Sequence, residues 1–191
     1  EVIISLEKMN KILDFDESSN TVICEPGVIT KNLQEFAKDK NLFYPVDFSS
    51  SGSSHIGGNI ATNAGGIKVF RYGLTGNHTI GVEVIDGEGV EHNYDKNLIK
   101  NATGPNPKNY FIGSEGIFGI MKSCNMQLIS KPQISKVALL SFENLNQLNT
   151  IRQNLIYSGD IEAFEFFDKN ATKEVKDEFL IDTDIGNDSP Y

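Results

Sequence analysis

A stretch rich in glycine, serine and asparagine most constrains what this 191-residue chain can fold into. Residues 49–76 read SSSGSSHIGGNIATNAGGIKVFRYGLTG and hold seven glycines. Glycine has no Cβ, so the backbone there can adopt positive φ and come into direct contact with another molecule. Ile56, Ile60 and Ala61 are spaced among the glycines, so part of the stretch can pack in a core while the rest is presented to solvent. We therefore interpret it as a binding loop and not as a flexible linker.

A second, shorter glycine segment, GSEGIFG, occupies residues 113–119. The two segments are the places where backbone N–H groups can converge on a phosphate or a ring system. Neither matches the dinucleotide fingerprint GxGxxG, and the sequence contains no GxxxxGK[ST], which disfavours a Rossmann NAD site and a P-loop ATPase. Alone, the second segment fits a structural turn about as well. Together with the serine run of the first, it favours a cofactor cradle.

Composition excludes several classes of partner. The chain has 26 acidic and 17 basic residues and a formal net charge of −9, which argues against nucleic-acid binding and against an anionic membrane surface. No apolar run approaches the roughly 18 residues of a membrane-spanning helix. His55, His78 and His92 lack ligand spacing, so we expect no metal site in these residues. Cys24 and Cys124 are expected to be unpaired thiols in a reducing compartment.

The expected secondary structure is of the α+β class. In the first part, we expect a strand at 2–5, helical turns over 6–13, a polar turn over 14–20, a helix over 30–41 that Thr30 caps, and strands at 21–25, 79–85, 90–93, 110–112 and 120–129. A boundary is expected at residues 131–133. Beyond it, strands at 137–142 and 161–167 alternate with helices at 145–157 and about 170–179, an order that predicts half of a ferredoxin-like layer.

Several motifs, in this order along nearly the whole chain, strongly resemble the flavoprotein family of vanillyl-alcohol oxidase type. They are PG at 26–27, YPVD at 44–47, HIGGNIATNAGG at 55–66, RYG at 71–73, GVEVI at 81–85 and IGSEGIFGIM at 112–121. The chain looks most like the branch that contains D-lactate dehydrogenase, the glycolate oxidase FAD subunit and D-2-hydroxyglutarate dehydrogenase. The run AFEFFD at 163–168 resembles the last of these. One departure is that Ile117, Phe118 and Lys122 stand where the family usually has Thr, Leu and Thr.

The resemblance implies most of an FAD-binding PCMH-type domain over residues 1–132, without its N-terminal diphosphate loop, followed by the first half of a ferredoxin-like substrate domain over 133–191. It also implies which residues contact FAD. The diphosphate and ribityl region would lie against Asp47, Ser53, Ser54, Gly57, Gly58 and Asn59. The flavin would lie against Ala61, Thr62, Asn63 and Gly66, and the adenosine end against Glu115, Gly116, Gly119 and Ile120.

By the same resemblance, we expect a fragment of an FAD-dependent dehydrogenase that oxidises D-lactate, glycolate or D-2-hydroxyglutarate to the 2-oxo acid by hydride transfer to flavin N5. Electrons would leave to a quinone, a cytochrome or a flavoprotein. The groups that handle the substrate, and a divalent metal where one is present, would lie beyond residue 191, so we expect no catalytic residue in these residues and no turnover by them alone. The expected location is cytoplasmic, or peripheral to the membrane for the full protein.

Two alternatives stay open from the residues alone. One is a flavin-binding or nucleotide-binding domain without catalytic activity. The other is a different oxidase, or a UDP-sugar reductase, that shares the FAD domain. The region that follows residue 191 distinguishes them, because it would hold the substrate groups.

Overall fold

The computed structural model describes residues 2–98, 100–158 and 161–179. Its contacts divide the chain into two compact units, residues 1–133 and 134–191. Each unit is described by itself below.

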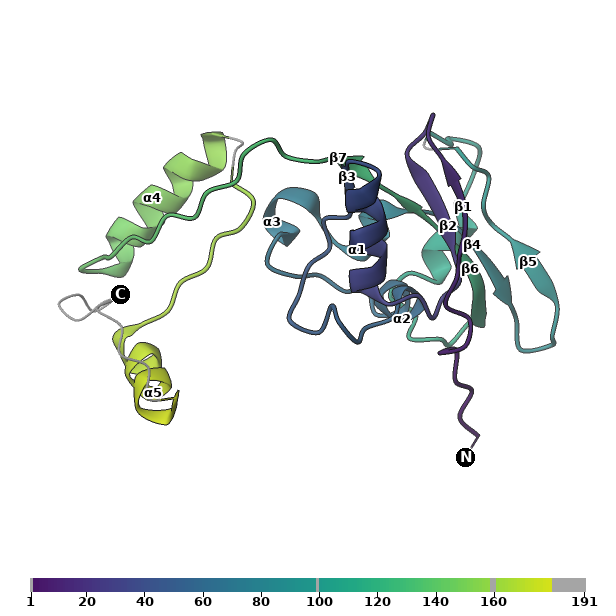
Figure 1. Cartoon of the computed structure of the whole chain (residues 1–191), viewed down its shortest axis with the longest axis horizontal. Helices are drawn as coiled ribbons and strands as arrows, with labels where there is room; N and C mark the ends of the chain where they lie inside the picture. The colour runs from purple at the N-terminus through teal and green to yellow at the C-terminus, as the bar shows by residue number, and fades with distance from the viewer. Residues whose placement is uncertain (1, 99, 159–160, 180–191) are drawn as a thin grey trace. The chain divides into compact units, whose positions relative to one another are not determined.

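The first unit is built on a five-stranded antiparallel sheet with the order β1-β2-β6-β4-β5 (Figure 1). The strands predicted at 21–25, 79–85, 90–93 and 120–129 are present. The sheet consists of β1 (Ile12–Asp16), β2 (Thr21–Cys24), β4 (Thr79–Ile85), β5 (Glu91–Asn93) and β6 (Ile120–Gln127). A second, two-stranded sheet pairs β3 (Leu42–Phe43) with β7 (Ile129–Ser130). The chain thus returns from residue 120 to pair with strands formed near its beginning.

Residues alternate between the two faces of the large sheet, as strand geometry requires. Along β2 and β6, Val22 stands opposite Met126 and Cys24 opposite Cys124, and all four side chains are fully buried. In β4, Val82 continues the same apolar face. The intervening positions of β6 carry polar side chains on the other face. One face of the sheet therefore forms one side of the hydrophobic core.

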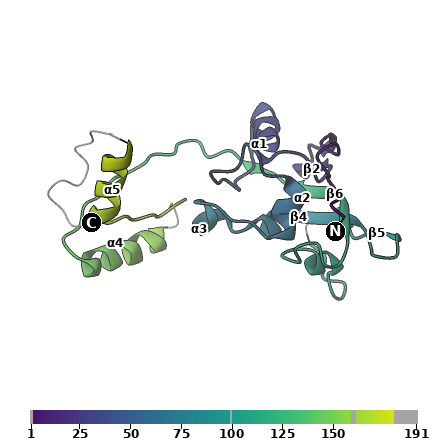
Figure 2. The same ribbon diagram turned by 90° about the horizontal axis from the view of Figure 1, so that it is seen from below.

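Two helices supply the rest of that core. Helix α1 (Thr30–Asp39) contributes Leu33 and Ala37, and helix α2 (Ile56–Ala61) contributes Ile56 and Ile60, all with no exposed area. Figures 1 and 2 show both helices beside the strand layer. Residues of both helices belong to one cluster with the apolar sheet face, so burial of this shared surface sets where α2 and the glycine stretch lie.

The two cysteines are free, as expected from the sequence, and both are buried. Burial raises the pKa of the Cys24 thiol to about 12, and it raises the pKa of Cys124 well above its ordinary value. Both thiols are therefore protonated at neutral pH and act as small apolar side chains at one end of the β2–β6 pairing.

Some elements expected in the first unit are not formed. Residues 2–5 are not a strand, and Val2 and Ile3 are 92% and 91% exposed, because this segment finds no strand partner among the described residues. The helical turns expected over 6–13 are replaced by a short turn and the first residues of β1. Further along β1, Phe15 packs edge-to-face on Phe36 with ring centroids 5.6 Å apart. The polar turn expected over 14–20 is confined to residues 17–20, because β1 extends to Asp16. The prediction of a strand at 110–112 is also wrong. Residue 110 ends a 3-10 helix, η2 (Pro107–Tyr110), and the next residues form a turn.

The second unit contains helices α4 (Leu145–Ser158) and α5 (Lys169–Phe179), close to the predicted ranges. The strands predicted at 137–142 and 161–167 are not formed. Val137 is 98% exposed and Phe166 is 57% exposed, although Phe142 at the end of the first segment is buried. A strand needs a neighbour to pair its backbone groups, and the described residues provide none for these two segments. The ferredoxin-like layer is therefore not seen. No helix in the described parts of either unit has the length and apolar character needed to cross a membrane.

Candidate functional site

The two glycine segments are joined by backbone hydrogen bonds. The N–H of Gly113 donates to the carbonyl of Ile60 at 2.9 Å, and the N–H of Glu115 donates to the carbonyl of Ala61 at 2.8 Å. The second segment therefore lies along the end of α2. We call residues 56–66 and 113–120 together the glycine cradle.

Asn63 connects the cradle to the turn that precedes β4. Its backbone has a φ of 48°, in the left-handed region that asparagine tolerates better than most residues. Its Oδ1 accepts a hydrogen bond from the N–H of Gly76 at 2.9 Å, in the 3-10 helix η1 (Thr75–His78). Glu115 also has a positive φ, 53°, which costs on the order of 1 kcal/mol for such a residue. Two predicted site residues, Asn63 and Glu115, thus have left-handed backbone conformations.

The serine run forms a compact turn, residues 49–54, which we call the serine turn. The N–H of Ser54 donates to the carbonyl of Ser50 at 2.9 Å, and the N–H of Thr30 donates to the carbonyl of Ser54 at 2.9 Å. The buried Asn59 of α2 donates from Nδ2 to the Thr30 hydroxyl at 2.6 Å. The start of α1, the serine turn and α2 are therefore held together by polar contacts beneath the surface.

The glycines of the cradle fall into two groups. A Cβ at Gly57 would lie 2.6 Å from the Pro26 Cβ, and one at Gly66 would lie 1.7 Å from the Asp47 carbonyl oxygen, so packing within the protein requires glycine there. A Cβ at Gly58 or Gly116 would meet no heavy atom within 4 Å. Glycine inside a helix costs about 1 kcal/mol relative to alanine. Since nothing in the protein requires glycine at Gly58, the open space beside it fits close approach by a bound group.

The fourteen residues predicted to contact the cofactor differ in accessibility. Those with exposed positions are Ser53, Gly58, Thr62, Glu115, Gly116 and Ile120. Half-buried positions are Asp47, Ser54, Ala61, Asn63, Gly66 and Gly119, and buried ones are Gly57 and Asn59. The last two are directed into the protein, Gly57 against Pro26 and Asn59 toward Thr30, and they support the cradle from inside.

Charge beside the cradle is locally balanced. The Asp47 carboxylate lies 3.5 Å from the Lys68 ammonium, and the Asp47 carbonyl accepts a hydrogen bond from the N–H of Ile67 at 3.2 Å. The Lys68 ammonium also lies over the Phe43 ring, 4.7 Å from its centroid. A cation close to Asp47 makes this side of the cradle less repulsive to an anionic ligand.

Sequence reasoning missed three contributors to the site. Thr30 was expected to cap α1, but Ile29 precedes the helix without a capping side chain, and the Thr30 hydroxyl bonds to Asn59 and Ser54. No sequence pattern indicated that Lys68 would lie beside the site.

The third contributor is the exposed Phe118, which lies near Gly116. Its ring makes edge contacts with Tyr110 and Phe111, with centroid separations of 6.3 and 6.4 Å, and it provides apolar surface next to the second glycine segment.

The histidines do not form a metal centre. His78 is buried, its Nε2 lies 2.8 Å from the Tyr72 carbonyl oxygen, and burial lowers its pKa below the ordinary value. His92 pairs with Asp86 at 2.7 Å, and this hydrogen bond holds the pKa of Asp86 below its usual value. Among the described residues, no three His, Cys, Asp or Glu side chains gather in a way that can hold a metal ion.

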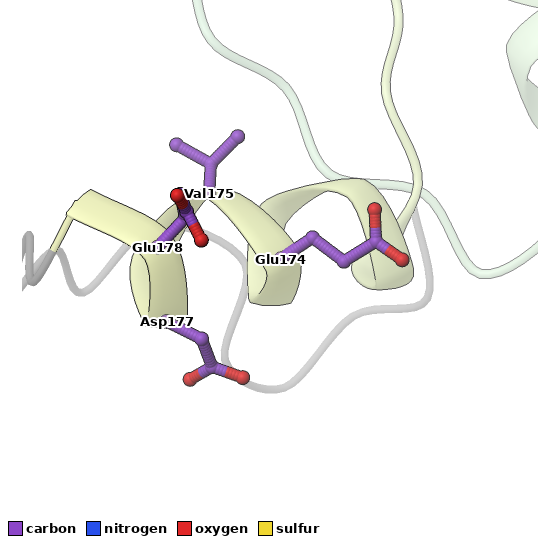
Figure 3. A pocket seen from close by; sticks show the side chains of 4 residues that line it. All are labelled: Glu174, Val175, Asp177 and Glu178. Atoms are coloured by element: carbon purple, nitrogen blue, oxygen red, sulfur yellow. The ribbon is translucent and has the colours of Figure 1, made fainter.

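A hollow elsewhere in the chain lies beside α5 in the second unit. Figure 3 shows its lining, Glu174, Val175, Asp177 and Glu178. Three carboxylates would repel the phosphates of a nucleotide, so this hollow does not compete with the cradle as a cofactor site.

Comparison with known proteins gives a family for the first half of the chain. Residues 1–94 match the FAD binding domain family. Over 191 residues the chain is 42% identical to D-2-hydroxyglutarate dehydrogenase of Stutzerimonas stutzeri (strain A1501), a match that covers 100% of this chain and 41% of the relative. It is 36% identical over 178 residues to the mitochondrial D-2-hydroxyglutarate dehydrogenase of Bos taurus, covering 92% of this chain and 33% of the relative. The chain thus spans less than half the length of these relatives.

A solved structure shares the fold of most of the chain. An alkyldihydroxyacetonephosphate synthase superposes with a TM-score of 0.58 and 25% sequence identity, covering 67% of this chain and 23% of that one. A second crystal form of a protein with the same name gives the same TM-score.

The two groups of glycines predict opposite effects of alanine substitution on stability. Gly66→Ala should lower the free energy of unfolding by about 2 kcal/mol or more, because the Asp47 backbone has to move. Gly58→Ala should leave it unchanged or raise it by up to about 1 kcal/mol, because alanine is the better helix former and has room. Urea unfolding of both variants measures the difference. Equal destabilisation would contradict the assignment of open space at Gly58.

We expect the buried His78 to make the folded protein less stable in mild acid. Because burial lowers its pKa in the folded state, the unfolded chain binds the proton more readily as pH falls below the ordinary value of 6.5. The free energy of unfolding should fall below that pH, with a contribution of at most about 1.4 kcal/mol per pH unit. His78→Gln should remove this part of the slope between pH 7 and 5. Identical slopes for the variant and the native protein would contradict it.

Proposed function

We propose that the first unit holds FAD in the glycine cradle, because residues 1–94 of the chain match the FAD binding domain family. The observation that carries this proposal is the open space at Gly58 and Gly116 in two segments tied together by backbone hydrogen bonds. A Cβ at either position would occupy that space. The residues present fit the group, since small side chains permit close approach, serine and threonine hydroxyls supply polar contacts, and Phe118 supplies apolar surface.

We assign parts of FAD to parts of the cradle as a proposal. The diphosphate and ribityl region would lie along the serine turn and Gly58, the flavin beside residues 61–66, and the adenosine end beside Glu115, Gly116 and Ile120. Lys68 supports the first assignment, because it offsets the Asp47 carboxylate next to an anionic group. Asn59 and Gly57 would act by supporting the loop, since both are buried.

We propose that the complete gene product is an FAD-dependent D-2-hydroxyglutarate dehydrogenase. Its support is identity of 34–42% to proteins of that name over nine-tenths or more of this chain. FAD, when bound, supplies the chemistry by accepting a hydride from the α-carbon of the hydroxy acid. The residues of this chain would bind and orient the cofactor. We assign no catalytic base to them, and the electron acceptor is proposed to be a quinone, a cytochrome or a flavoprotein.

The second unit is proposed to begin a substrate domain with a ferredoxin-like layer. Support comes from α4 and α5, which occupy about the sequence ranges predicted for the helices of that layer, and from the match to the Stutzerimonas relative along the entire chain. The proposed location is the cytoplasm, a reducing compartment in which two free thiols are expected. Attachment of the complete protein to the membrane periphery is the alternative.

One observation favours an activity other than a dehydrogenase for the complete gene product. The solved structures that share this fold are named as a synthase and not as a dehydrogenase, so the same domain occurs with other chemistry. Identity along the full chain favours the dehydrogenase.

The proposal predicts both a spectrum and a substrate preference. The purified complete gene product should show flavin absorption near about 375 and 450 nm and should reduce a dye acceptor with D-2-hydroxyglutarate. D-lactate and glycolate test the neighbouring activities, and L-2-hydroxyglutarate is the stereochemical control. The 191-residue chain alone should not turn over any of them. A complete protein without flavin bands, or one that oxidises none of the D-acids, would refute the proposal.

The same proposal predicts that Gly58→Ala weakens FAD binding by about 10-fold or more, because a methyl group would fill the space beside the cofactor. Gly87→Ala is the matched control. Gly87 also has no heavy atom within 4 Å of an added Cβ, but it lies in the β4–β5 turn away from the cradle. Fluorescence titration of FAD measures both. Native-like affinity in Gly58→Ala would show that FAD lies elsewhere.

A further inference from the structure

We propose that Asn59 and Thr30 form a hydrogen-bond chain that orients the Ser54 hydroxyl, so that Ser54 donates a hydrogen bond to a phosphate oxygen of the bound dinucleotide. This inference rests on the proposed function and concerns how the serine turn recognises the diphosphate. Asn59 and Thr30 act as positioning residues inside the protein, and Ser54 makes the contact.

The chain begins at a buried amide. Asn59 is 4% exposed, and its Nδ2 lies 2.6 Å from the Oγ1 of Thr30, which is fully buried at the start of α1. An amide nitrogen can only donate, so the Thr30 oxygen is the acceptor in this bond. The Thr30 hydroxyl therefore has its own single proton to give elsewhere.

Both acceptors for that proton belong to Ser54. The Ser54 Oγ lies 2.8 Å from the Thr30 Oγ1, and the Ser54 carbonyl oxygen lies 3.2 Å from it. Either hydroxyl can donate in the shorter contact, because a hydroxyl both donates and accepts. When an anionic oxygen lies beside Ser54, the favoured arrangement is the one in which Thr30 donates to the Ser54 Oγ, because it frees the Ser54 proton for that oxygen.

In that arrangement the Ser54 proton has no acceptor among the described residues, since Thr30 is the only partner of its hydroxyl there. Ser54 is half-buried at the end of the serine turn, so its hydroxyl can reach a ligand. A donor held in place by two preceding donors suits an anionic oxygen, because bonds in such a chain polarise one another and bonds to charged acceptors are stronger.

A serine outside the cradle and the serine turn provides a control. The Ser18 hydroxyl donates to the Asp16 Oδ1 at 2.7 Å, in the turn between β1 and β2. Its side chain is exposed. Ser18→Ala therefore removes a serine hydroxyl from the same unit without removing the proposed contact.

A double-mutant cycle on the complete gene product tests the inference. FAD and ADP affinities are measured by calorimetry for Ser54→Ala, Thr30→Val and the double variant, with thermal unfolding followed in parallel. Ser54→Ala should weaken both ligands by about 10-fold, as expected for one bond to a charged group. Thr30→Val should weaken both comparably, and the double variant should bind no more weakly than Ser54→Ala. Thr30→Ser, which keeps the hydroxyl, should restore affinity to within about 2-fold of the native protein.

The outcomes separate the two proposals. Multiplied losses in the double variant, or equal affinities of Ser54→Ala and Ser18→Ala, overturn the hydrogen-bond chain while FAD binding by the native protein stands. Should Thr30→Val fail to fold, the Ser54→Ala and Ser18→Ala comparison still decides, because neither changes the core. A native protein that binds neither FAD nor ADP overturns the proposed function and this inference with it.

Discussion

The site depends on two backbone hydrogen bonds, from Gly113 to Ile60 and from Glu115 to Ala61. They join segments that lie about fifty residues apart in the sequence, and they place both beside α2. Because α2 packs through Ile56 and Ile60 into the core above the sheet, the position of the cradle is set by hydrophobic burial. The exposed glycines are thus presented by a rigid support, which is what close recognition of a cofactor requires.

Glycine has two distinct uses in this unit. At Gly57 and Gly66, it lets parts of the protein approach one another more closely than any side chain would allow. At Gly58 and Gly116, the space beside the backbone is open. The φ of 81° at Gly116 by itself favours glycine, whereas at Gly58 the absence of a Cβ benefits only a bound group. Both kinds of glycine look the same in a sequence motif, and only the atoms around each glycine in the structure distinguish the two uses.

The sequence predicted elements well where local pattern and packing agree. TIGVEVI alternates along β4 because one face is buried, and Leu33 and Ala37 share a face of α1 because that face packs on the sheet. It failed at residues 2–5 and 137–142, where strand-forming side chains have no partner strand within the described residues. Strand propensity describes suitability for pairing and does not guarantee that a neighbour exists.

For the candidate site, the glycine segments could be found from spacing and from family resemblance, but the contacts beneath them could not. The polar link from Asn59 to Thr30 spans 29 positions, and no local pattern encodes it. Thr30 has the composition of a helix cap, and only the approach of the serine turn shows that its hydroxyl is used otherwise. Lys68 is similarly placed by tertiary contacts with Asp47 and Phe43.

The strand order has a consequence for biosynthesis. β2 lies near the beginning of the chain, yet its neighbour on the inner side is β6, which comes last among the five strands of the large sheet. On a ribosome that adds about 5–20 residues per second, the first hairpin must wait for several seconds with its apolar edge unpaired. This unit therefore completes its sheet late in translation, and in that interval nascent chains are exposed to aggregation through this edge or to capture by chaperones.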